Sequence, residues 1–232
     1  NTLQYAWTTS WGLSTRFVGA IIMTHGDDQG LVLPPRLAPI QAVIVPIFKS
    51  DAEITPVMNA AERIRNELKA AGIRIKLDDR KEVTPGFKFN DWEMRGVPLR
   101  IEIGPKDIEK DTVALARRDK PGKEGKSFVP QSGVTGTISD LLIDIQKTML
   151  QKATTFRDSN IHEPKDYTDL KNIVEDGWAY AYWCESSDCE TKVKDDTKAT
   201  TRCIPLDQHD GSGNCIVCGK RASRKVIFAK AY

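Results

Sequence analysis

The stretch QAVIVPIF, residues 41–48, decides the fold, because it is a near-continuous apolar run of the length of one strand. Such a run is typical of a strand covered on both faces, as in a parallel sheet. Apolar residues at helical spacing follow over 57–71, and Thr55 with Pro56 is expected to begin this helix, which Gly72 ends. A buried strand followed directly by an amphipathic helix predicts an α/β domain.

The next residues continue this alternation. The sequence predicts a strand over 73–78, a helix over 84–95, and alternating strands over 97–103 and 112–118. The order βαβαββ indicates an open, mostly parallel sheet with helices packed on it. Residues 119–136 are polar and marked by Gly and Pro, so we expect a loop or hairpin there.

The N-terminal segment, residues 1–39, is expected to form a helix over 14–25 and a short strand over 31–35 that ends at prolines. One helix and one strand cannot bury that much apolar surface by themselves. We therefore expect this segment to belong to a larger domain whose earlier part is absent from the chain.

The C-terminal residues, from about 137, predict a small α+β domain. A long helix over 137–158 is expected to begin with a capping box of Thr137 and Asp140. Thr168 is expected to cap a second helix that ends near Glu175, and a strand is expected over 178–183. The last residues are small and polar until a final apolar run at 226–229.

The composition is that of an ordinary globular protein. The 232 residues carry a formal net charge of +2, with 40% hydrophobic and 28% charged residues, which rules out a disordered or collagen-like chain. A net charge near zero excludes a strongly basic nucleic-acid coat and leaves room for a local basic patch. No apolar run of 18 residues and no signal peptide are present, so we expect a cytoplasmic protein without a transmembrane helix.

All five cysteines lie from residue 184 onward, which suggests a metal site. Zinc prefers four tetrahedral ligands, and a CxxC turn places two sulfurs on one metal. The four expected ligands form two close pairs: Cys184, Cys189, Cys215 and Cys218. A four-thiolate shell leaves no open position, so the expected site is structural rather than catalytic.

Other interpretations of these residues remain open. The CxxC could be a redox pair, although such pairs usually begin a helix after a strand. His162 or His209 could replace one cysteine as a ligand. Cys203 is isolated and followed by Ile204-Pro205, so we expect it to be a buried structural thiol.

The segment TSWGLSTRFVGA, residues 9–20, suits a nucleotide. Gly12 allows close approach of the backbone to a ligand. Arg16 supplies a planar cation for stacking and donors for phosphate, with the hydroxyls of Ser14 and Thr15 beside it. Taken alone, an arginine in the first turns of a helix is more often a solvated or salt-bridged residue.

Taken with later motifs, this segment resembles motif 3 of class II aminoacyl-tRNA synthetases, and the chain is similar to the prolyl-tRNA synthetase family of the archaeal and eukaryotic type. The resemblance rests on MTHGDD at 23–28, LVLPPRLAP at 31–39, TPGFKF at 84–89, IGPKD at 103–107, and on the TTRC, CxxC and AKAY motifs near the end. It implies residues 1–39 as the end of a catalytic domain, 40–136 as an anticodon-binding domain and 137–232 as a zinc-binding domain.

The resemblance also implies roles for single residues. It places ATP at Gly12, Ser14 and Arg16, with Arg16 as the catalytic contact and Mg²⁺ as a further cofactor. It assigns the two guanines of the anticodon of tRNA(Pro) to Glu93, Arg100, Lys106 and Asp107, with Lys123 as a further contact. It assigns the zinc ion to the same four cysteines, not to Cys203, and brings the terminal carboxylate of Tyr232 near the active site.

Each charge assigned to the anticodon also has a structural interpretation. Arg100 and Glu102 alternate on a strand and could form a solvated face, and Glu93 could pair with Arg95 or Arg100. Proline and ATP would be substrates of the complete enzyme, which is typically a homodimer. Motifs 1 and 2 of the class are missing, so we expect this chain alone to be inactive. The alternative functions are a non-catalytic tRNA-binding module and a zinc-stabilised interaction scaffold.

Overall fold

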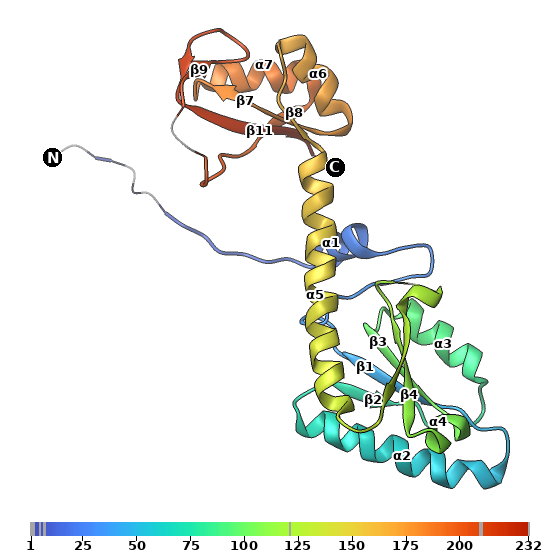
Figure 1. Cartoon of the computed structure of the whole chain (residues 1–232). Coiled ribbons are helices and arrows are strands. Elements are labelled where there is room, and N and C mark those ends of the chain that lie inside the picture. Colours follow the sequence, from blue (N-terminus) through green and yellow to red (C-terminus); the bar gives the residue numbers. More distant parts are fainter. Residues whose placement is uncertain (1–2, 5, 7, 121, 209–210, 232) are drawn as a thin grey trace. The chain divides into compact units, whose positions relative to one another are not determined.

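The structure, a computed structural model, describes residues 3–4, 6, 8–120, 122–208 and 211–231. It divides into two compact units, Asn1–Ala153 and Thr154–Tyr232, which can be followed by colour in Figure 1. Among the helices within these described ranges, none combines the length and the hydropathy that crossing a membrane requires.

A five-stranded sheet forms the centre of the first unit, with the order β2-β1-β3-β4-β5. β1 pairs in parallel with both β2 and β3, whereas β3 with β4 and β4 with β5 are antiparallel. The strands are β1 (Ala42–Pro46), β2 (Ile75–Leu77), β3 (Leu99–Ile103), β4 (Thr112–Arg117) and β5 (Lys126–Pro130).

The sheet is thus mixed rather than mostly parallel, although the order βαβαββ is confirmed. A parallel connection needs a crossover of a dozen or more residues. The connections after β3 and β4 are shorter than that and hold only the short helix α4 (Pro105–Glu109) and the 3₁₀ turn η1 (Gly122–Gly125). The chain therefore reverses at both places, and β5 completes a hairpin within residues 119–136.

The helix α2 (Asp51–Ala70) begins earlier than expected. The carboxylate of Glu53 accepts hydrogen bonds from the backbone N–H groups of Lys49 (2.7 Å) and Ser50 (3.2 Å), so Ser50 is the N-cap. The prediction that Thr55 and Pro56 begin this helix is wrong, and Pro56 lies inside it. The expected end at Gly72 is confirmed, because the helix stops at Ala70 and Gly72 has a positive φ of 80°.

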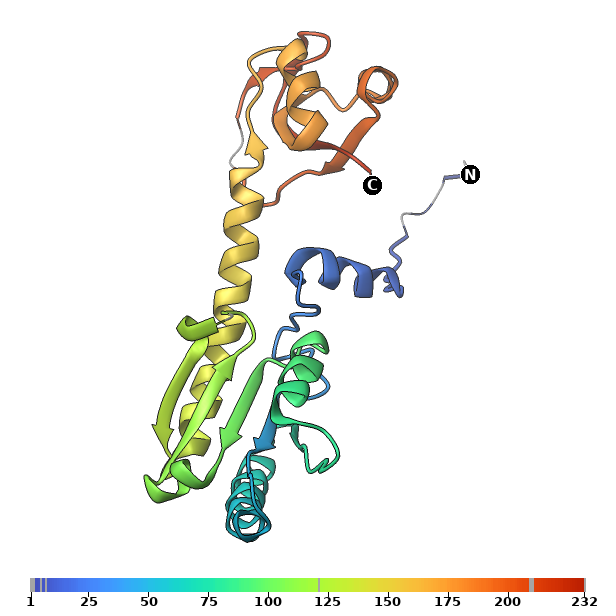
Figure 2. The ribbon, with the colours of Figure 1, turned by 90° about the vertical axis from the view of Figure 1, so that its right-hand side faces the viewer.

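The two faces of the sheet are covered differently. On one face, α2 and α5 (Val134–Ser159) enclose a large core with the strand residues Leu99, Ile101 and Leu115. On the other face, Trp92 of α3 (Pro85–Met94) packs with Val43, and this smaller cluster reaches only as far as β1. Figure 2 shows α5 behind the strands β3 to β5, whose near side carries no helix.

The long helix α5 starts at Val134, so Thr137 lies inside the helix and the expected capping box of Thr137 and Asp140 is wrong. Its buried stripe, from Val134 to Met149, belongs to the large core of the first unit. For this reason the compact units divide after Ala153, and not between residues 136 and 137.

The N-terminal helix α1 (Arg16–His25) lies close to its predicted place but has no buried residue. The strand expected over 31–35 is absent. Instead, the N–H groups of Leu31 and Leu33 donate to the carbonyls of Met94 (3.0 Å) and Gly96 (3.2 Å) at the end of α3. Pro34 and Pro35 cannot donate to a sheet ladder, which explains why the segment docks without forming a strand.

The second unit contains a four-stranded sheet of order β6-β7-β11-β8 and two helices. Its buried core is small and includes Leu170, Val193, Val226 and Phe228. The elements are β6 (Ile161–His162), α6 (Tyr167–Asp176), β7 (Trp178–Trp183), α7 (Ser187–Thr197), β8 (Ala199–Cys203), β9 (Gly213–Asn214), β10 (Arg221–Ala222) and β11 (Arg224–Lys230).

The strand predicted at 178–183 is confirmed, but the cap of α6 is not Thr168. The side chain of Asp166 accepts a hydrogen bond from the N–H of Asp169 (2.8 Å) and begins the helix two residues earlier. The helix α7 was not predicted, because its polar sequence SDCETKVKDDT buries only three residues.

Candidate nucleic-acid interface and metal centre

Arg100 on β3 is the centre of a charged network. Its Nη1 lies 2.6 Å from Oε1 of Glu93 on α3, and its Nε lies 3.0 Å from Oε1 of Glu102 on the same strand. Lys126 on β5 contacts the second oxygen of Glu102 at 2.7 Å. The side chain of Arg100 is only 13% exposed, so the interpretation of Arg100 and Glu102 as a solvated face is wrong.

The pairing of Glu93 is also settled. Glu93 pairs with Arg100, whereas Arg95 bonds to Asp91 at 2.9 Å. The guanidinium of Arg100 also lies over the ring of Phe89, 4.1 Å from its centroid. The aromatic ring and two carboxylates therefore hold the guanidinium in one orientation.

The strand register explains how Lys126 reaches Glu102 across an intervening strand. Arg100 lies opposite Ala116, which lies opposite Lys126, and all three side chains therefore share one face. Glu102 and Ala114 form the neighbouring row. Because β4 presents only short alanine side chains here, the lysine can cross above them.

This arrangement can recognise the edge of a nucleobase. The two ion pairs use two of the five N–H donors of Arg100, so further donors remain for a ligand. Glu93 is about one-third exposed and its carboxylate can accept hydrogen bonds. Guanine offers the complementary set, since O6 and N7 accept and the ring and amino N–H groups donate.

Arg118 is a positioning residue that the sequence did not indicate. Its guanidinium makes two hydrogen bonds to the carboxylate of Asp27 (2.7 and 2.5 Å), and its Nε donates to the carbonyl of Glu93 (2.9 Å). The bonds from Arg118 lower the pKa of Asp27 below its usual value. Arg118 thereby ties the loop after α1 to the end of α3 that carries Glu93.

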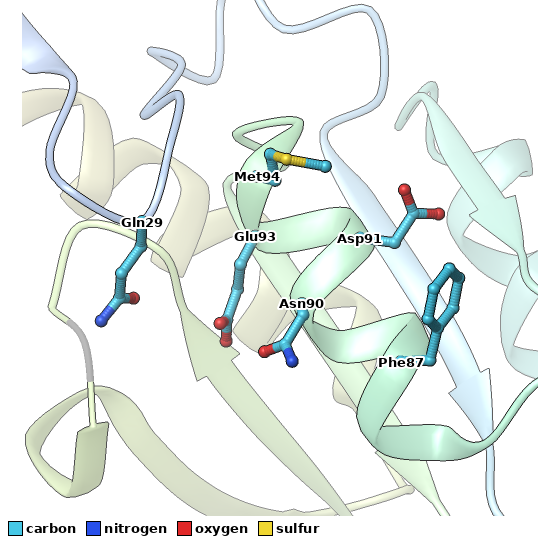
Figure 3. Close-up of a pocket in the computed structure, with 6 residues that line it drawn as sticks. All are labelled: Gln29, Phe87, Asn90, Asp91, Glu93 and Met94. Carbon is cyan, nitrogen blue, oxygen red and sulfur yellow. The ribbon is translucent and has the colours of Figure 1, made fainter.

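A shallow pocket lies beside Glu93, lined by residues of α3 and by Gln29 from the loop after α1. Figure 3 shows Glu93 and Asn90 projecting from the same side of α3, with Gln29 across from them, while Phe87 and Asp91 project from another side. An amide on each wall and a carboxylate between them provide both donors and acceptors.

The other residues assigned to the anticodon lie apart from this network. Lys106 and Asp107 are in α4, which follows the carboxyl end of β3, and Asp107 Oδ2 accepts from the N–H of Gly104 at 2.9 Å. Lys123 is an exposed residue of η1, which follows β4 near the opposite end of β3. The structure thus brings Glu93 and Arg100 together and leaves Lys106, Asp107 and Lys123 at the two ends of β3.

A buried ionic cluster joins the end of β2 to α3. Asp78 follows β2, is 2% exposed, and accepts hydrogen bonds from Arg80 and from Nε1 of Trp92 (2.8 Å). The buried Lys88 donates to the backbone carbonyl of Asp78 at 3.0 Å. Burial alone would raise the pKa of Asp78, but the bonds from Arg80 and Trp92 and the charge of Lys88 lower it to about 2.

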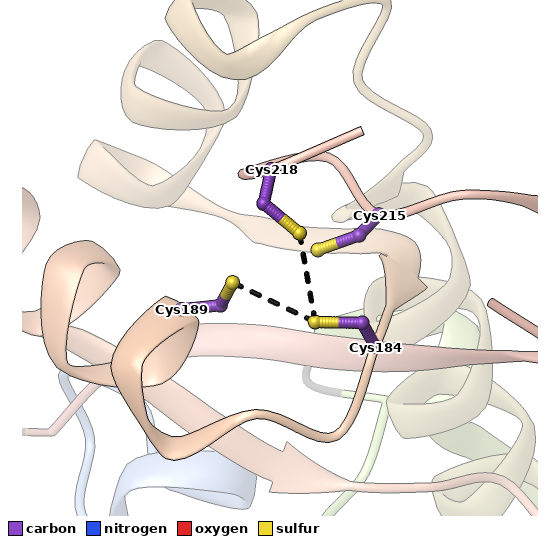
Figure 4. A group of neighbouring side chains, drawn as sticks. All are labelled: Cys184, Cys189, Cys215 and Cys218. Carbon is purple, nitrogen blue, oxygen red and sulfur yellow. Dashed lines mark hydrogen bonds between the residues drawn. The ribbon is translucent and has the colours of Figure 1, made fainter. Parts of the chain in front are cut away.

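The four predicted metal ligands converge in the second unit, as Figure 4 shows. The four sulfur atoms, of Cys184, Cys189, Cys215 and Cys218, all lie within 4.8 Å of one another. Cys184 follows β7, Cys189 lies in the first turn of α7, and the other two flank a turn that a hydrogen bond from the N–H of Gly219 to the carbonyl of Cys215 (2.9 Å) closes.

The sulfur spacing fits a single tetrahedral ion. Cys184 Sγ lies 3.6 Å from Cys189 Sγ and 3.7 Å from Cys218 Sγ. A tetrahedron with zinc–sulfur distances of about 2.3 Å has edges of about 3.8 Å. Burial raises the pKa of Cys215, but backbone N–H groups of Cys218, Val217 and Cys184 donate to its sulfur, and its pKa falls to about 7. At Cys184 and Cys189 the pKa is raised instead, at Cys189 mainly by burial.

Cys203 is exposed, so the expectation of a buried structural thiol is wrong. It is the last residue of the edge strand β8, where the pairing with β11 shifts register. His162 is exposed on β6 and is not part of the cysteine group. His209 and Tyr232 lie outside the described residues.

The predicted nucleotide-binding segment is exposed to solvent in this structure. Ser14 Oγ accepts a hydrogen bond from the N–H of Arg16 at 3.3 Å, at the start of α1. Gly12, Ser14 and Arg16 are all exposed, and so are the large apolar residues Trp11, Phe17 and Met23 around them. The geometry neither assembles nor contradicts an ATP site, which stays a prediction.

Comparison with known proteins identifies two families in the chain. Residues 41–131 match the family described as anticodon binding domain, and residues 167–232 match the family described as prolyl-tRNA synthetase, C-terminal. The first match contains the network around Arg100, and the second contains all four clustered cysteines. The chain therefore carries an anticodon-binding domain and the C-terminal domain of an aminoacyl-tRNA synthetase.

Whole-chain relatives agree. A proline–tRNA ligase of Roseiflexus sp. is 55% identical over the whole chain, which covers 48% of that relative. A chloroplastic/mitochondrial proline–tRNA ligase of Arabidopsis thaliana is 50% identical over 99% of the chain and 43% of that relative. A crystal structure of prolyl-tRNA synthetase from Cryptosporidium parvum, with L-proline and AMP, has a TM-score of 0.87 at 37% identity and covers 96% of this chain and 47% of that one.

The chain belongs to the prolyl-tRNA synthetase family and corresponds to its C-terminal portion. It spans about half the length of the curated relatives it matches.

Proposed function

We propose that this chain is the anticodon-reading and C-terminal part of a proline–tRNA ligase, which joins proline to tRNA(Pro) by way of a prolyl-adenylate. Identity to proline–tRNA ligases along the whole chain supports the assignment. The main observation in favour of anticodon recognition is the ion pair of Arg100 and Glu93, on the face of the sheet where no helix covers β3 to β5.

In this proposal, Arg100 donates to the O6 and N7 acceptors of an anticodon guanine, and Glu93 accepts from the N–H groups of a guanine. Unpaired loop bases expose these edges, unlike bases in an RNA helix. Lys106, Asp107 and Lys123 would contact the loop at either end of β3. Since Asp107 already bonds to a backbone N–H, its free oxygen would be the atom that faces RNA.

The four cysteines would hold one zinc ion. Zinc would supply a closed tetrahedral cross-link between β7, α7 and the turn at Cys215 and Cys218, without an open position for catalysis. The convergence of the four sulfur atoms and the sulfur–sulfur distances support a metal bound by four cysteines.

The ATP site would involve Gly12, Ser14 and Arg16, with Mg²⁺ on the phosphates, inside the complete enzyme. The exposed apolar residues of α1 and the segment before it support the view that this region packs against further protein. The complete enzyme would be a cytoplasmic homodimer. The 232-residue chain alone would not form prolyl-adenylate, and proline-dependent exchange of pyrophosphate into ATP by this chain would contradict that.

Binding of tRNA tests the reading role. Arg100→Ala should lower the affinity for tRNA(Pro) by about 1–3 kcal/mol and should reduce the preference over a tRNA(Pro) with changed anticodon guanines. Both affinities can be measured by fluorescence anisotropy. Arg65→Ala, which removes a half-buried arginine from α2, is the charge-matched control and should leave both affinities unchanged.

Loss of Arg100 also leaves Glu93 without its ion-pair partner and leaves Glu102 with Lys126, so thermal unfolding must show that the variant is folded. Arg100→Lys serves as a second variant, because it keeps the charge but removes the planar fork that reads two acceptors. Equal losses on cognate and altered tRNA for both variants would remove Arg100 from base reading.

A further inference from the structure

Phe128 is an exposed aromatic residue on the edge strand β5, and the reading role proposed above does not use it. It is 67% exposed, although large apolar side chains are usually covered. The register places it opposite Ala114, which lies opposite Glu102. Phe128 therefore shares the face, and the row, of the charged network around Arg100.

The surroundings of Phe128 are basic. Lys126 Nζ lies 5.8 Å from the centroid of the ring, and Lys120 and Lys123 precede it in the same hairpin as exposed residues. Glu124 is the one acidic side chain within the residues 120–128 that the structure describes. Cations around an exposed ring favour an anionic partner with a flat apolar surface over an apolar protein surface.

An RNA base fits this description. Stacking on an aromatic side chain does not depend on which base is present, and neighbouring lysines can contact the phosphates. The side chains of β4 beneath are alanines, so no large side chain separates Phe128 from the place where Arg100 and Glu93 would hold a guanine. The separation is two strand spacings, or about 10 Å.

We propose that Phe128 is a stacking platform for an unpaired base of the anticodon loop, next to the base read by Arg100 and Glu93. This inference rests on the proposed function. Phe128 would add affinity without base selectivity, whereas Arg100 adds selectivity.

The test uses the whole chain and a fluorescent RNA hairpin with the anticodon stem and loop of tRNA(Pro). Phe128→Leu keeps an apolar side chain and removes the π-face, and it should weaken binding roughly 5- to 150-fold. Phe128→Tyr should restore most of the affinity. Phe156→Leu removes an equally exposed phenylalanine (69%) from α5 and should have no effect.

A second measurement separates stacking from a general loss of fold. A hairpin with 2-aminopurine at each loop position in turn should show quenching at one position with the wild-type chain, and Phe128→Leu should abolish that quenching. Unchanged affinity and quenching in Phe128→Leu, or equal losses in Phe128→Tyr and Phe128→Leu, would overturn the inference.

The outcomes also distinguish this inference from the proposed function. If the wild-type chain binds the hairpin and Arg100→Ala weakens it while Phe128→Leu does not, only the stacking role fails. If the wild-type chain does not prefer the hairpin to a duplex RNA without a loop, the proposed function itself fails, and the inference fails with it.

Discussion

Asp78 illustrates how a single buried residue positions α3, the helix that carries Glu93. It is almost fully buried, and it joins the end of β2 to this helix. The sequence predicts Asp78 as the last residue of a strand, followed by the charged residues 79–82, and nothing local indicates that it is buried. Its burial depends on Trp92 and Lys88, which come from another element.

Asp78→Asn should destabilise the first unit by on the order of 3 kcal/mol, because it removes the counter-charge beside the buried Lys88, whereas Arg80 keeps its ion pair with Asp91. Urea unfolding at pH 7 would measure this. Asp79→Asn, a change at the exposed neighbour, is the control and should stay within about 0.5 kcal/mol of the wild type.

The same residue has a pH signature. The pKa of Asp78 is lowered from 3.8 to about 2 in the folded chain, so its stabilisation is complete above pH 4 and is lost as the pH falls from 4 to 2. The amount is about 2 kcal/mol, since one pKa unit corresponds to about 1.4 kcal/mol. In Asp78→Asn the free energy of unfolding should therefore change less between pH 4 and pH 2 than in the wild type. An equal change in both proteins would contradict a lowered pKa of Asp78.

At the same scale, spacing predicted the four clustered cysteines but not the state of the fifth. Within each pair the two cysteines are close in the sequence, and close spacing already places their sulfur atoms near each other. The exposure of Cys203 depends on its place at the end of an edge strand, where pairing with β11 shifts register. Similarly, Arg118 acts through Asp27, which is far away in the sequence, so no spacing could have indicated it.

At the scale of elements, strands and helices with strong periodicity were predicted, but several starts were not. Pro56 suggested a helix start, yet the hydrogen bonds of Glu53 set the start at Asp51. The segment at 31–35 has the composition of a strand, but its partner is the carboxyl end of α3. The start of α2 was missed because a local capping box, Ser50 with Glu53, outweighs the signal of Pro56. The segment at 31–35 was missed because its partner lies about sixty residues further along the chain.

The docking of that segment gives a prediction for a pair of glycines. Gly72 and Gly96 both have positive φ, at 80° and 71°, after α2 and α3. An added Cβ would meet nothing at Gly72, whereas at Gly96 it would lie 2.6 Å from Leu31 Cβ and 2.8 Å from the Leu31 backbone. Only the second substitution therefore disturbs the docked segment.

Gly72→Ala should cost about 1–2 kcal/mol for its left-handed backbone. Gly96→Ala should cost a further 1–3 kcal/mol or so, because the chain must move to remove the overlap. Urea unfolding would measure both, and faster amide hydrogen exchange at Leu31 and Leu33 in Gly96→Ala alone would locate the effect. Equal losses in the two variants would mean that the segment is not docked here.

At the scale of the whole molecule, the two units differ in what stabilises them. The core of the first unit joins residues of the strands β1 to β4 and the two long helices α2 and α5. Among the residues that the structure describes, the hydrophobic cluster at the centre of the second unit has eight buried members, three of which are alanines. A core this small usually needs a cross-link, and the cysteine cluster connects β7, α7 and the turn before β10.

Removal of the metal should therefore unfold the second unit and spare the first. The purified chain should contain one zinc per chain by elemental analysis. After chelation, residues 167–230 should exchange their amide hydrogens rapidly, while β1, β3 and β4 stay protected, because the ligands are the main cross-link of the second unit only. Exchange unchanged in both units would contradict a structural metal.

Two exposed cysteines provide the matched comparison for this prediction. Cys218 and Cys203 are both exposed thiols in the second unit, but only Cys218 belongs to the cluster. Cys218→Ser should lower zinc content and protection together, whereas Cys203→Ser should change neither. Because both variants make the same chemical change at similar exposure, a loss of zinc in Cys203→Ser equal to that in Cys218→Ser would show that the four-cysteine cluster is not the metal site.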